Sequence, residues 1–461
     1  MKKIAIVCGN TDRPIRRKAV EVLSRILQDY TLEYPICVTH AGEAPSSYRK
    51  IFIGTAAELA VHIEALPAQP ESYAITVKND TVYIVGADDH GVLYGCVDFY
   101  TQYILKQEFP NDDRYRVNCF ETALPDFSYA SGPAVKDRGI WTWGHVIYDY
   151  RGFIDHMVLL KMNTLIVWND HVPYNAREMV DYAHDCGVKV IWGFAWGWDT
   201  GDVTPSLEKI FASSQTIFDR YQREYGDVGG DGIYFQSFTE TNYEHIGGVL
   251  IAEAVTEFVN RTAALFYEAY PDMEIQFGLH ATSVKGRLEY IRRTDPRIRI
   301  VWENCGAFPF SYVPNDVQDF DQTMEFVKRI AVLRGENDRF GAVTKGLTKL
   351  DWSKFEHIDG PVYIGAASPW MKRNRMERKS KIWRYIQAQW MIHGGEALEM
   401  MRTMAQAKDG NLCITGLIED GVFGAQLMFP AALFGEMLWD NESTVEALIE
   451  RTALRSDVTF A

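Results

Sequence analysis

The sequence predicts an α/β protein: a (β/α)8 TIM barrel preceded by a small α/β sandwich domain. Between residues 137 and 461, eight short apolar segments alternate with segments of helical period, which is the pattern of such a barrel. The first 125 residues form a separate series of strands and helices. The chain of 461 residues is longer than the roughly 250 that a barrel needs, so two domains are expected. A doubly wound sheet is the rival architecture, but it rarely uses eight consecutive units.

The small domain is predicted to span residues 1–125, followed by a linker at 126–136 and the barrel at 137–461. Its strands are predicted at 3–7, 34–39, 50–53, 73–78 and 81–85, and its helices at 13–27, 56–65 and 91–105. Asn79-Asp80, between the last two strands, is a hairpin turn signal. Two prolines and little periodicity between 121 and 133 predict the linker.

The barrel strands are predicted at 139–142, 164–168, 188–194, 232–237, 274–279, 297–302, 342–347 and 412–417. The helices that follow them are predicted at 150–161, 176–185, 207–225, 246–270, 286–294, 319–333 and 378–404. A further apolar run at 361–365 competes for the place of strand 7 or 8, and we place it in an extended loop.

The charge balance argues against several partners. The 47 Lys and Arg face 62 Asp and Glu, and a net charge of −15 repels nucleic acid and anionic membranes. No apolar stretch approaches the roughly 20 residues of a membrane span, and Gly9 and Asn10 cut the N-terminal apolar run too early for a signal peptide. The seven cysteines are scattered, without CxxC. We expect a reduced, cytoplasmic protein without metal or cofactor; a homo-oligomer is compatible with the sequence.

Chemistry in such barrels lies at the C-terminal ends of the strands. Glu240 and Glu303 follow the fourth and sixth predicted strands, and these two glutamates are the candidate catalytic residues. Candidate substrate-binding residues at strand ends are Arg138, Trp141, Trp143, Asn169, Asp170, His171, Trp196, Trp198, His280, Trp302, Lys349, Asp351 and Trp352. Aromatic rings stack on sugars, and paired carboxylates serve glycosidic cleavage. The combination indicates a carbohydrate site.

Structural explanations compete with each of these assignments. Large aromatics pack beneath loops in many proteins. Glu303 fits an ion pair with an arginine, and Glu240 fits a cap of the next helix. His280 fits a buried, hydrogen-bonded histidine, and residues 169–171 fit a turn. Other chemistries lack their motifs: there is no GxSxG, GxxxxGK[ST] or HExxH, and the glycine-rich segment 228–232 leads into a strand.

Motifs in both domains resemble those of known carbohydrate enzymes. The run Gly86-Ala87-Asp88-Asp89-His90-Gly91-Val92-Leu93-Tyr94-Gly95 resembles the domain that precedes the barrel in bacterial β-N-acetylhexosaminidases and α-glucuronidases. Arg138-Gly139 is similar to the Arg-Gly that opens those barrels, where the arginine binds sugar hydroxyls. The strand that starts at Asp231 and leads to Glu240 resembles their acid-bearing strand, and residues 430–439 resemble the barrel-closing helix.

The resemblance implies a glycoside hydrolase that cleaves a terminal sugar from an oligosaccharide or small glycoside. Thr239 stands where the hexosaminidases have an Asp beside the acid, so the α-glucuronidase pattern fits better. That pattern implies Glu240 as general acid, Glu303 as general base and Asp351 as a further carboxylate. A uronate substrate implies a cationic clamp, for which Lys349, Arg138 and the cluster at 372–375 are candidates.

Two alternatives stay open. One is substrate-assisted, β-N-acetylhexosaminidase-like hydrolysis, with Asp170, Asn242 or another group in place of the missing Asp. The other is a non-catalytic carbohydrate-binding protein on a hydrolase scaffold. For the leading hypothesis, strands 4 and 6 are two strands apart, which favours carboxyl groups roughly 6.5–9.5 Å apart and inversion of configuration.

Overall fold

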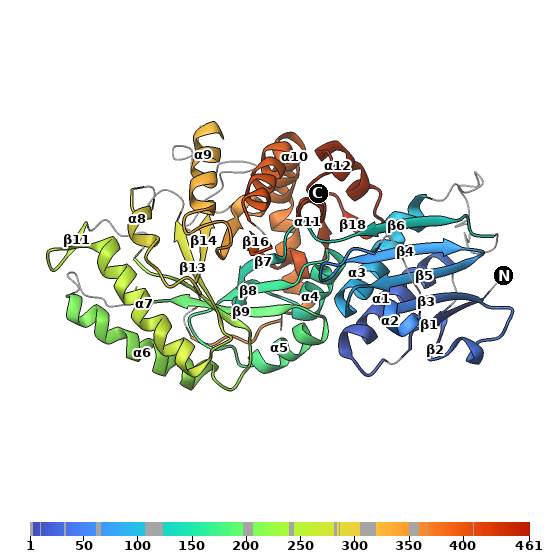
Figure 1. Ribbon diagram of the computed structural model, residues 1–461, viewed down its shortest axis with the longest axis horizontal. Coiled ribbons are helices and arrows are strands. Elements are labelled where there is room, and N and C mark those ends of the chain that lie inside the picture. The colour runs from blue at the N-terminus through green and yellow to red at the C-terminus, as the bar shows by residue number, and fades with distance from the viewer. Residues whose placement is uncertain are drawn as a thin grey trace. The chain divides into compact units, whose positions relative to one another are not determined.

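The computed structural model describes residues 3–9, 11–31, 34–60, 66–106, 123–196, 206–238, 244–280, 284, 286–304, 320–349, 358, 360–365, 367–408 and 410–461 (Figure 1). The chain divides into two compact units. One comprises Met1–Ala134, His184–Gly187 and Ala453–Ser456, and the other comprises Val135–Ala183, Val188–Thr452 and Asp457–Ala461.

The first unit contains a six-stranded mixed sheet in the order β2-β1-β3-β5-β4-β6. Its strands are β1 (Ile4–Val7), β2 (Ile36–Val38), β3 (Arg49–Thr55), β4 (Tyr73–Lys78), β5 (Thr81–Gly86) and β6 (Phe127–Ser131). The five expected strands are confirmed. The sixth, β6, falls within the segment expected to be a linker, where it pairs antiparallel with β4.

The helices of this unit are α1 (Pro14–Thr31), α2 (Ala56–Leu59) and α3 (Asp89–Asp98), which continues as a π-turn (Phe99–Tyr103) and a 3-10 turn (Ile104–Lys106). Asn79 and Asp80 have φ of +49° and +65°, as a two-residue type I′ hairpin requires, so the hairpin prediction is confirmed.

The glycine-rich motif at the start of α3 has a packing explanation. A Cβ on Gly91 would lie 2.1 Å from the Ser72 carbonyl oxygen, and one on Gly86 would lie 2.2 Å from the Val92 nitrogen. Asp88 caps the helix by accepting a hydrogen bond from the Gly91 N–H at 2.8 Å. The motif therefore brings the helix start against the β4–β5 hairpin.

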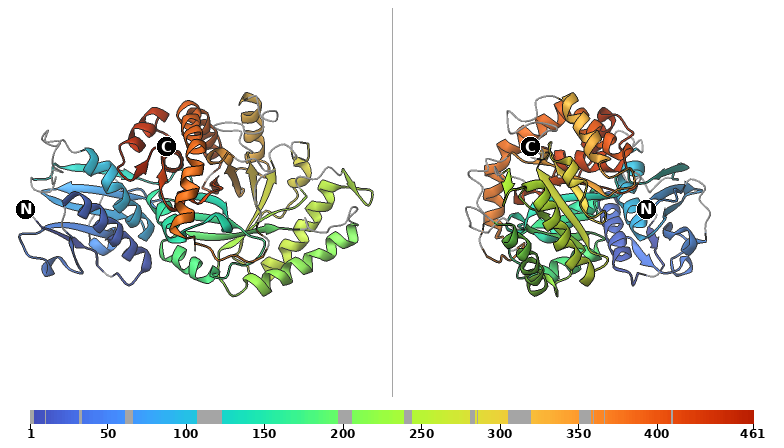
Figure 2. Two further views of the ribbon diagram at one scale, coloured as in Figure 1. Left: turned by 180° about the vertical axis from the view of Figure 1, so that it is seen from behind. Right: turned by 60° about the vertical axis from the view of Figure 1, so that its left-hand side comes forward.

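The second unit is a closed barrel of eight parallel strands in the order β10-β13-β14-β15-β16-β7-β8-β9, which confirms the predicted fold class. The strands are β7 (Asp137–Trp143), β8 (Thr164–Trp168), β9 (Lys189–Ala195), β10 (Gly232–Gln236), β13 (Glu274–His280), β14 (Arg299–Glu303), β15 (Phe340–Thr344) and β16 (Leu412–Leu417). All eight predicted strands are present, with ends shifted by at most three residues. Figure 2 shows the helices of this unit on the outside of the strands.

The barrel helices are α4 (Tyr150–Leu159), α5 (Ala176–Asp185), α6 (Leu207–Tyr225), α7 (Ile251–Ala269), α8 (Leu288–Ile291), α9 (Phe320–Ala331), α10 (Pro369–Gln406), α11 (Phe429–Trp439) and α12 (Val445–Ala453). Two short pairs, β11 (His245–Ile246) with β12 (Val249–Leu250) and β17 (Leu427–Met428) with β18 (Val458–Thr459), complete the unit. In the part of the chain that the structure describes, no helix is long and apolar enough to span a membrane. The described residues of the 361–365 run form no strand.

Alternate residues of each barrel strand face the interior. An apolar cluster fills its middle and includes Trp141, Trp143, Tyr234, Val301 and Leu417. The neighbours of these residues in the strands face the helices instead. This alternation decides which strand-end side chains reach the mouth of the barrel.

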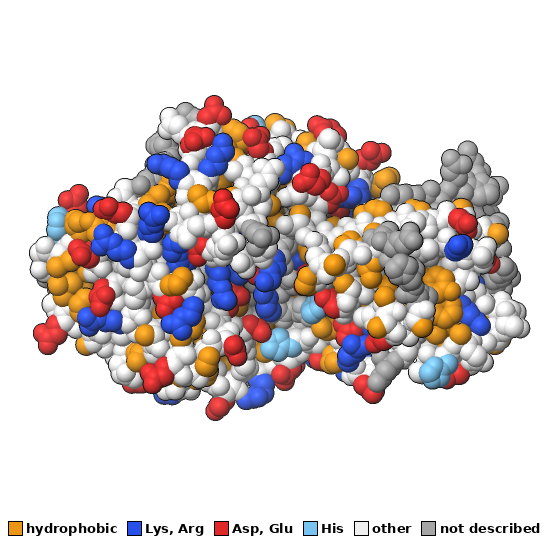
Figure 3. Space-filling model, in the orientation of Figure 1, with side chains coloured by type: hydrophobic (Ala, Val, Ile, Leu, Met, Phe, Trp, Pro, Cys, Tyr) orange, Lys and Arg blue, Asp and Glu red, His pale blue; other side chains and the backbone are white. Residues whose placement is uncertain are grey.

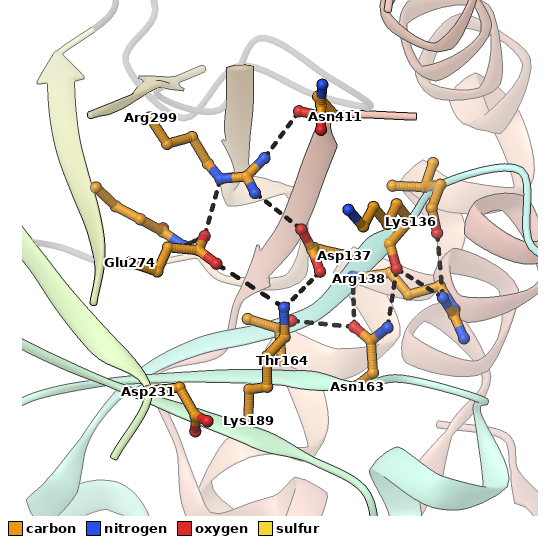
Figure 4. Close-up of polar contacts among 12 residues, drawn as sticks. Lys136, Asp137, Arg138, Asn163, Thr164, Lys189, Asp231, Glu274, Arg299 and Asn411 are labelled. Carbon is orange, nitrogen blue, oxygen red and sulfur yellow. Dashed lines mark hydrogen bonds and ion pairs between the residues drawn. The ribbon is translucent and has the colours of Figure 1, made fainter. Parts of the chain in front are cut away.

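The N-terminal ends of the strands hold a buried ion network (Figure 4). Asp137 pairs with Lys189 at 2.5 Å and with Arg299 at 2.8 Å, and Arg299 pairs with Glu274 at 2.9 Å. Burial opposes ionisation of Asp137, but Lys189 and Arg299 outweigh it and lower the pKa of that carboxyl. The network links β7, β9, β13 and β14 at the end of the barrel opposite the mouth.

Candidate active site

Glu303, the last residue of β14, lies in the barrel mouth and is 3% exposed. Its Oε1 accepts hydrogen bonds from the Tyr234 hydroxyl at 2.6 Å and from the Gln236 amide, and its Oε2 pairs with Lys345 Nζ at 2.8 Å. His280 stands opposite Glu303 in the β13–β14 pairing. Four neighbouring strands of the barrel thus bring polar groups around one carboxylate.

The surroundings of Glu303 determine its protonation state. Burial alone would raise its pKa, but the Lys345 charge and the hydrogen bonds from Lys345 and Tyr234 lower the pKa of Glu303 from 4.5 to about 2. Glu303 is therefore an ionised carboxylate at neutral pH. So low a pKa makes it a strong fixed negative charge and a weak proton acceptor.

Aromatic rings lie beside this carboxylate. The ring centroid of Trp141 is 4.8 Å from that of Trp143, 5.9 Å from Trp168 and 5.8 Å from Tyr234. Tyr234 therefore belongs to the aromatic cluster through its ring and to the Glu303 site through its hydroxyl. Trp168 is only partly buried, so one ring of the cluster is accessible.

Two further carboxyl groups, those of Glu419 and Asp420, follow β16. Glu419 and Asp420 are each 2% exposed. Lys379 Nζ lies 2.7 Å from Glu419 Oε1, and the Trp383 indole donates to Asp420 Oδ2 at 3.1 Å. Burial raises the pKa of both carboxyl groups, and Asp420 raises that of Glu419 further. Lys379 and Trp383 are one turn apart on α10, so this pair fastens α10 to the end of β16.

Four predicted site residues, Glu240, Trp198, Asp351 and Trp352, lie outside the described residues. Trp141 and Trp143 lie in the buried apolar cluster of the barrel and are linked to Glu303 through Tyr234, whose ring is near Trp141 and whose hydroxyl bonds to Glu303. His280 pairs opposite Glu303 in the neighbouring strand.

Three other predicted residues lie elsewhere. Trp302 precedes Glu303 and faces the opposite way, with its ring 6.0 Å from Phe326 of α9. Trp196 stacks on Phe235 with a centroid distance of 3.7 Å and is fully buried. Arg138, near the start of β7, lies over the Trp439 ring of α11. Each faces the helix layer because strand residues alternate sides.

The remaining predicted residues are spread around the loops. Asn169 is buried and accepts a hydrogen bond from the Tyr225 hydroxyl through its carbonyl oxygen. Asp170 and His171 are exposed. Lys349 is exposed, with Nζ 3.8 Å from the Tyr385 ring centroid.

Three residues that hold Glu303 were not predicted: Tyr234, Gln236 and Lys345. Tyr234 and Gln236 alternate with Ile233 and Phe235 in β10, so the side-chain parity of that strand is the signal that would have found them. Lys345 was assigned to the middle of a strand, whereas β15 ends at Thr344 and Lys345 begins the turn at the mouth.

Among the residues described, no group of three or more His, Cys, Asp or Glu has the arrangement of a metal site. Acidic and basic side chains are interspersed on the face shown in Figure 3, although the net charge of the chain is −15.

No protein-family model and no curated protein matches the sequence. The fold is nevertheless similar to that of solved glycoside hydrolases. A family GH115 4-O-methyl-α-glucuronidase with specificity for decorated arabinogalactans aligns at a TM-score of 0.54 and 13% identity, over 98% of this chain and 59% of that chain. This chain thus spans less than two thirds of that enzyme.

Two β-N-acetylhexosaminidases align over 100% of this chain with a TM-score of 0.56. The GH20 enzyme of Streptomyces coelicolor A3(2) is 12% identical and covered over 94% of its length, and the Streptomyces plicatus enzyme is 10% identical and covered over 93%. These similarities confirm the resemblance to both groups of enzymes at the level of the fold.

Proposed function

We propose that the protein is a glycoside hydrolase that cleaves a terminal sugar from an oligosaccharide or small glycoside, with α-glucuronidase-like chemistry. The observation that supports this most is the buried, ionised Glu303 at the barrel mouth, bonded to Tyr234, whose ring lies near the partly buried Trp168. Such a mouth offers a sugar ring an aromatic surface and a negative charge for an oxocarbenium-like transition state.

In this proposal Glu240 protonates the leaving oxygen and Glu303 accepts a proton from the attacking water. A base with a pKa near 2 accepts a proton poorly, so substrate binding must loosen the contact of Glu303 with Lys345 or Gln236. Both donors are side chains at strand ends, where a ligand competes with them directly.

The test is a panel of aryl glycosides with the wild type and Glu240→Gln. A general acid contributes roughly 10²–10⁴ to the rate, so kcat/KM on the best substrate is expected to fall by that factor. Glu244→Gln is the matched control, because Glu244 is an exposed glutamate four residues away. A loss of less than about tenfold in Glu240→Gln contradicts the acid role. Sugar binding without any turnover would favour a non-catalytic carbohydrate-binding protein.

Substrate-assisted, β-N-acetylhexosaminidase-like cleavage is a second candidate, favoured by the near-complete coverage of the two Streptomyces structures. It predicts turnover of aryl N-acetylglucosaminides. Turnover of aryl glucuronides alone would reject it and support the first candidate.

A further inference from the structure

Three large aromatic side chains on the barrel unit are exposed to solvent: Tyr174 (75%), Tyr363 (54%) and Trp370 (64%). We call them the aromatic rim. Scattered exposed apolar residues are ordinary, whereas exposed aromatics grouped beside a candidate site mark a binding surface.

Backbone hydrogen bonds fix the aromatic rim to the loops that follow β7 and β8. The Tyr174 N–H donates to the Val362 carbonyl at 2.9 Å, which sets Tyr174 next to Tyr363. The Gly365 N–H donates to the Ile147 carbonyl at 2.9 Å, and Ile147 lies four residues beyond the end of β7 at Trp143. The rim therefore lies on the same side of the barrel as the mouth.

Trp370 is held at the start of α10. The Ser368 hydroxyl caps this helix by accepting the Met371 N–H at 3.2 Å, and Lys372 Nζ pairs with Asp149 at 2.8 Å. Asp149 is the cap of α4, the helix that follows β7. These contacts orient the first turn of α10 toward the strand ends.

The first turns of α10 are strongly basic. Residues 369–384 contain seven Lys or Arg and one acidic residue, Glu377, a local charge of +6 in a chain of net charge −15. Four of these cations, Arg373, Arg378, Lys381 and Arg384, are exposed. A surface that combines aromatic rings with exposed cations fits a ligand with apolar ring faces and carboxylate groups.

We propose that the aromatic rim and the exposed cations of α10 bind the leaving-group side of an acidic oligosaccharide chain. The preferred substrate is then a chain that carries uronate groups and extends beyond the cleaved sugar. The proposal rests on the proposed function, which makes the barrel mouth the site of cleavage. The rings stack on sugar faces and the cations pair with carboxylates.

Binding of a galacturonic acid hexamer and of cellohexaose, measured by calorimetry, tests the proposal without requiring turnover. The wild type is expected to bind the acidic hexamer more tightly, with an affinity that falls as salt rises. Trp370→Ala should weaken this binding about three- to tenfold, and Trp370→Phe should restore most of it. Arg373→Gln with Arg378→Gln should weaken the acidic hexamer and leave the neutral one unchanged.

Ile392→Ala is the control, because Ile392 is 69% exposed on the same helix but 22 residues, or about 33 Å, further along. Equal binding of both hexamers, or an effect of Trp370→Ala no larger than that of Ile392→Ala, overturns the proposal. So does a dimer that Trp370→Ala converts to a monomer, since the rim would then be an interface between copies.

The two proposals fail separately. Binding of the acidic hexamer through the rim with no cleavage of any glycoside contradicts the proposed function and supports the rim. Suppose that turnover of small aryl glycosides depends on Glu240 but that the rim contributes nothing to hexamer binding. This result contradicts the proposal about the rim and leaves the proposed function intact. Ile392→Ala is expected to leave turnover of small aryl glycosides within about twofold of the wild type.

Discussion

The two ends of the barrel both bury charge, but they do so differently. At the N-terminal ends, two carboxylates and two cations, Asp137, Glu274, Lys189 and Arg299, satisfy one another across four strands. At the mouth, the carboxylate of Glu303 accepts hydrogen bonds from Tyr234 and Gln236 and pairs with Lys345.

The contrast teaches how to interpret buried charge in this fold. A network that closes on itself between strands stabilises the barrel, since the end of such barrels opposite the mouth serves stability. A carboxylate surrounded by donors next to aromatic rings is the group that the proposed function assigns to substrate.

The largest expected effect is loss of activity in Glu303→Gln. The substitution keeps the size of the side chain and removes its charge, and we expect kcat/KM on the best aryl glycoside to fall roughly 10²–10⁴-fold. Circular dichroism should be unchanged. A fall of less than about tenfold would mean that Glu303 takes no part in catalysis. Its buried charge would then be structural, like that of the ion network at the N-terminal ends of the strands.

Arg299→Met should have a large effect on stability and little effect on turnover. It leaves Glu274 and Asp137 with one cation fewer in a buried site, which costs about 3–5 kcal/mol in the free energy of unfolding measured with urea. Arg297→Met is the control, since its pair with Asp295 is half exposed and contributes about 0–1 kcal/mol. A large loss of kcat in folded Arg299→Met would show that the two ends are not separate.

Lys345→Met should move the pH dependence of the mouth. The pKa of Glu303 is lowered in the folded protein from 4.5 to about 2, so its ionised form contributes stability that is present above pH 4.5 and is lost as the pH falls toward 2. Without the Lys345 charge, burial raises the pKa of Glu303, and the acid limb of kcat/KM should shift upward. Lys345→Arg should keep the wild-type limb; an identical limb in Lys345→Met contradicts this account.

The smallest effect on catalysis is expected for Trp302→Phe. Trp302 is 1% exposed and packs against α9, so the change should lower the free energy of unfolding by about 1–3 kcal/mol and leave KM within twofold. Trp143→Phe, on the mouth side, should raise KM instead. Equal effects of both substitutions on KM would mean that the alternation of strand faces does not separate substrate contacts from packing.

The fold was predictable because each barrel strand is a short apolar block and each helix an amphipathic one. All eight strands were found, since local pattern is enough to locate them. The additional strand β6 was missed because its residues, Phe-Ser-Tyr-Ala-Ser, are half-buried and carry prolines nearby, which resembles a linker.

The site was predictable only in part. Trp302 and Glu303 were both assigned to the mouth, although adjacent strand residues point to opposite sides. Lys345 was missed because a shift of three residues in the predicted strand end placed it inside the strand. A strand is still located correctly when its predicted end is shifted by a few residues, but the side of the sheet to which each end residue points is then predicted wrongly. The role of Glu240 stays a prediction.

The ion network of Asp137 also bears on the order in which the chain folds during synthesis. Its partners follow it by 52 residues at Lys189 and by 162 residues at Arg299. At a ribosomal rate of about 5–20 residues per second, the first barrel strand waits roughly 8–30 s for its most distant ion pair. Closure of the barrel is therefore a late event in translation. A chain stopped before β14 has Asp137, which is buried in the folded barrel, without its partner Arg299.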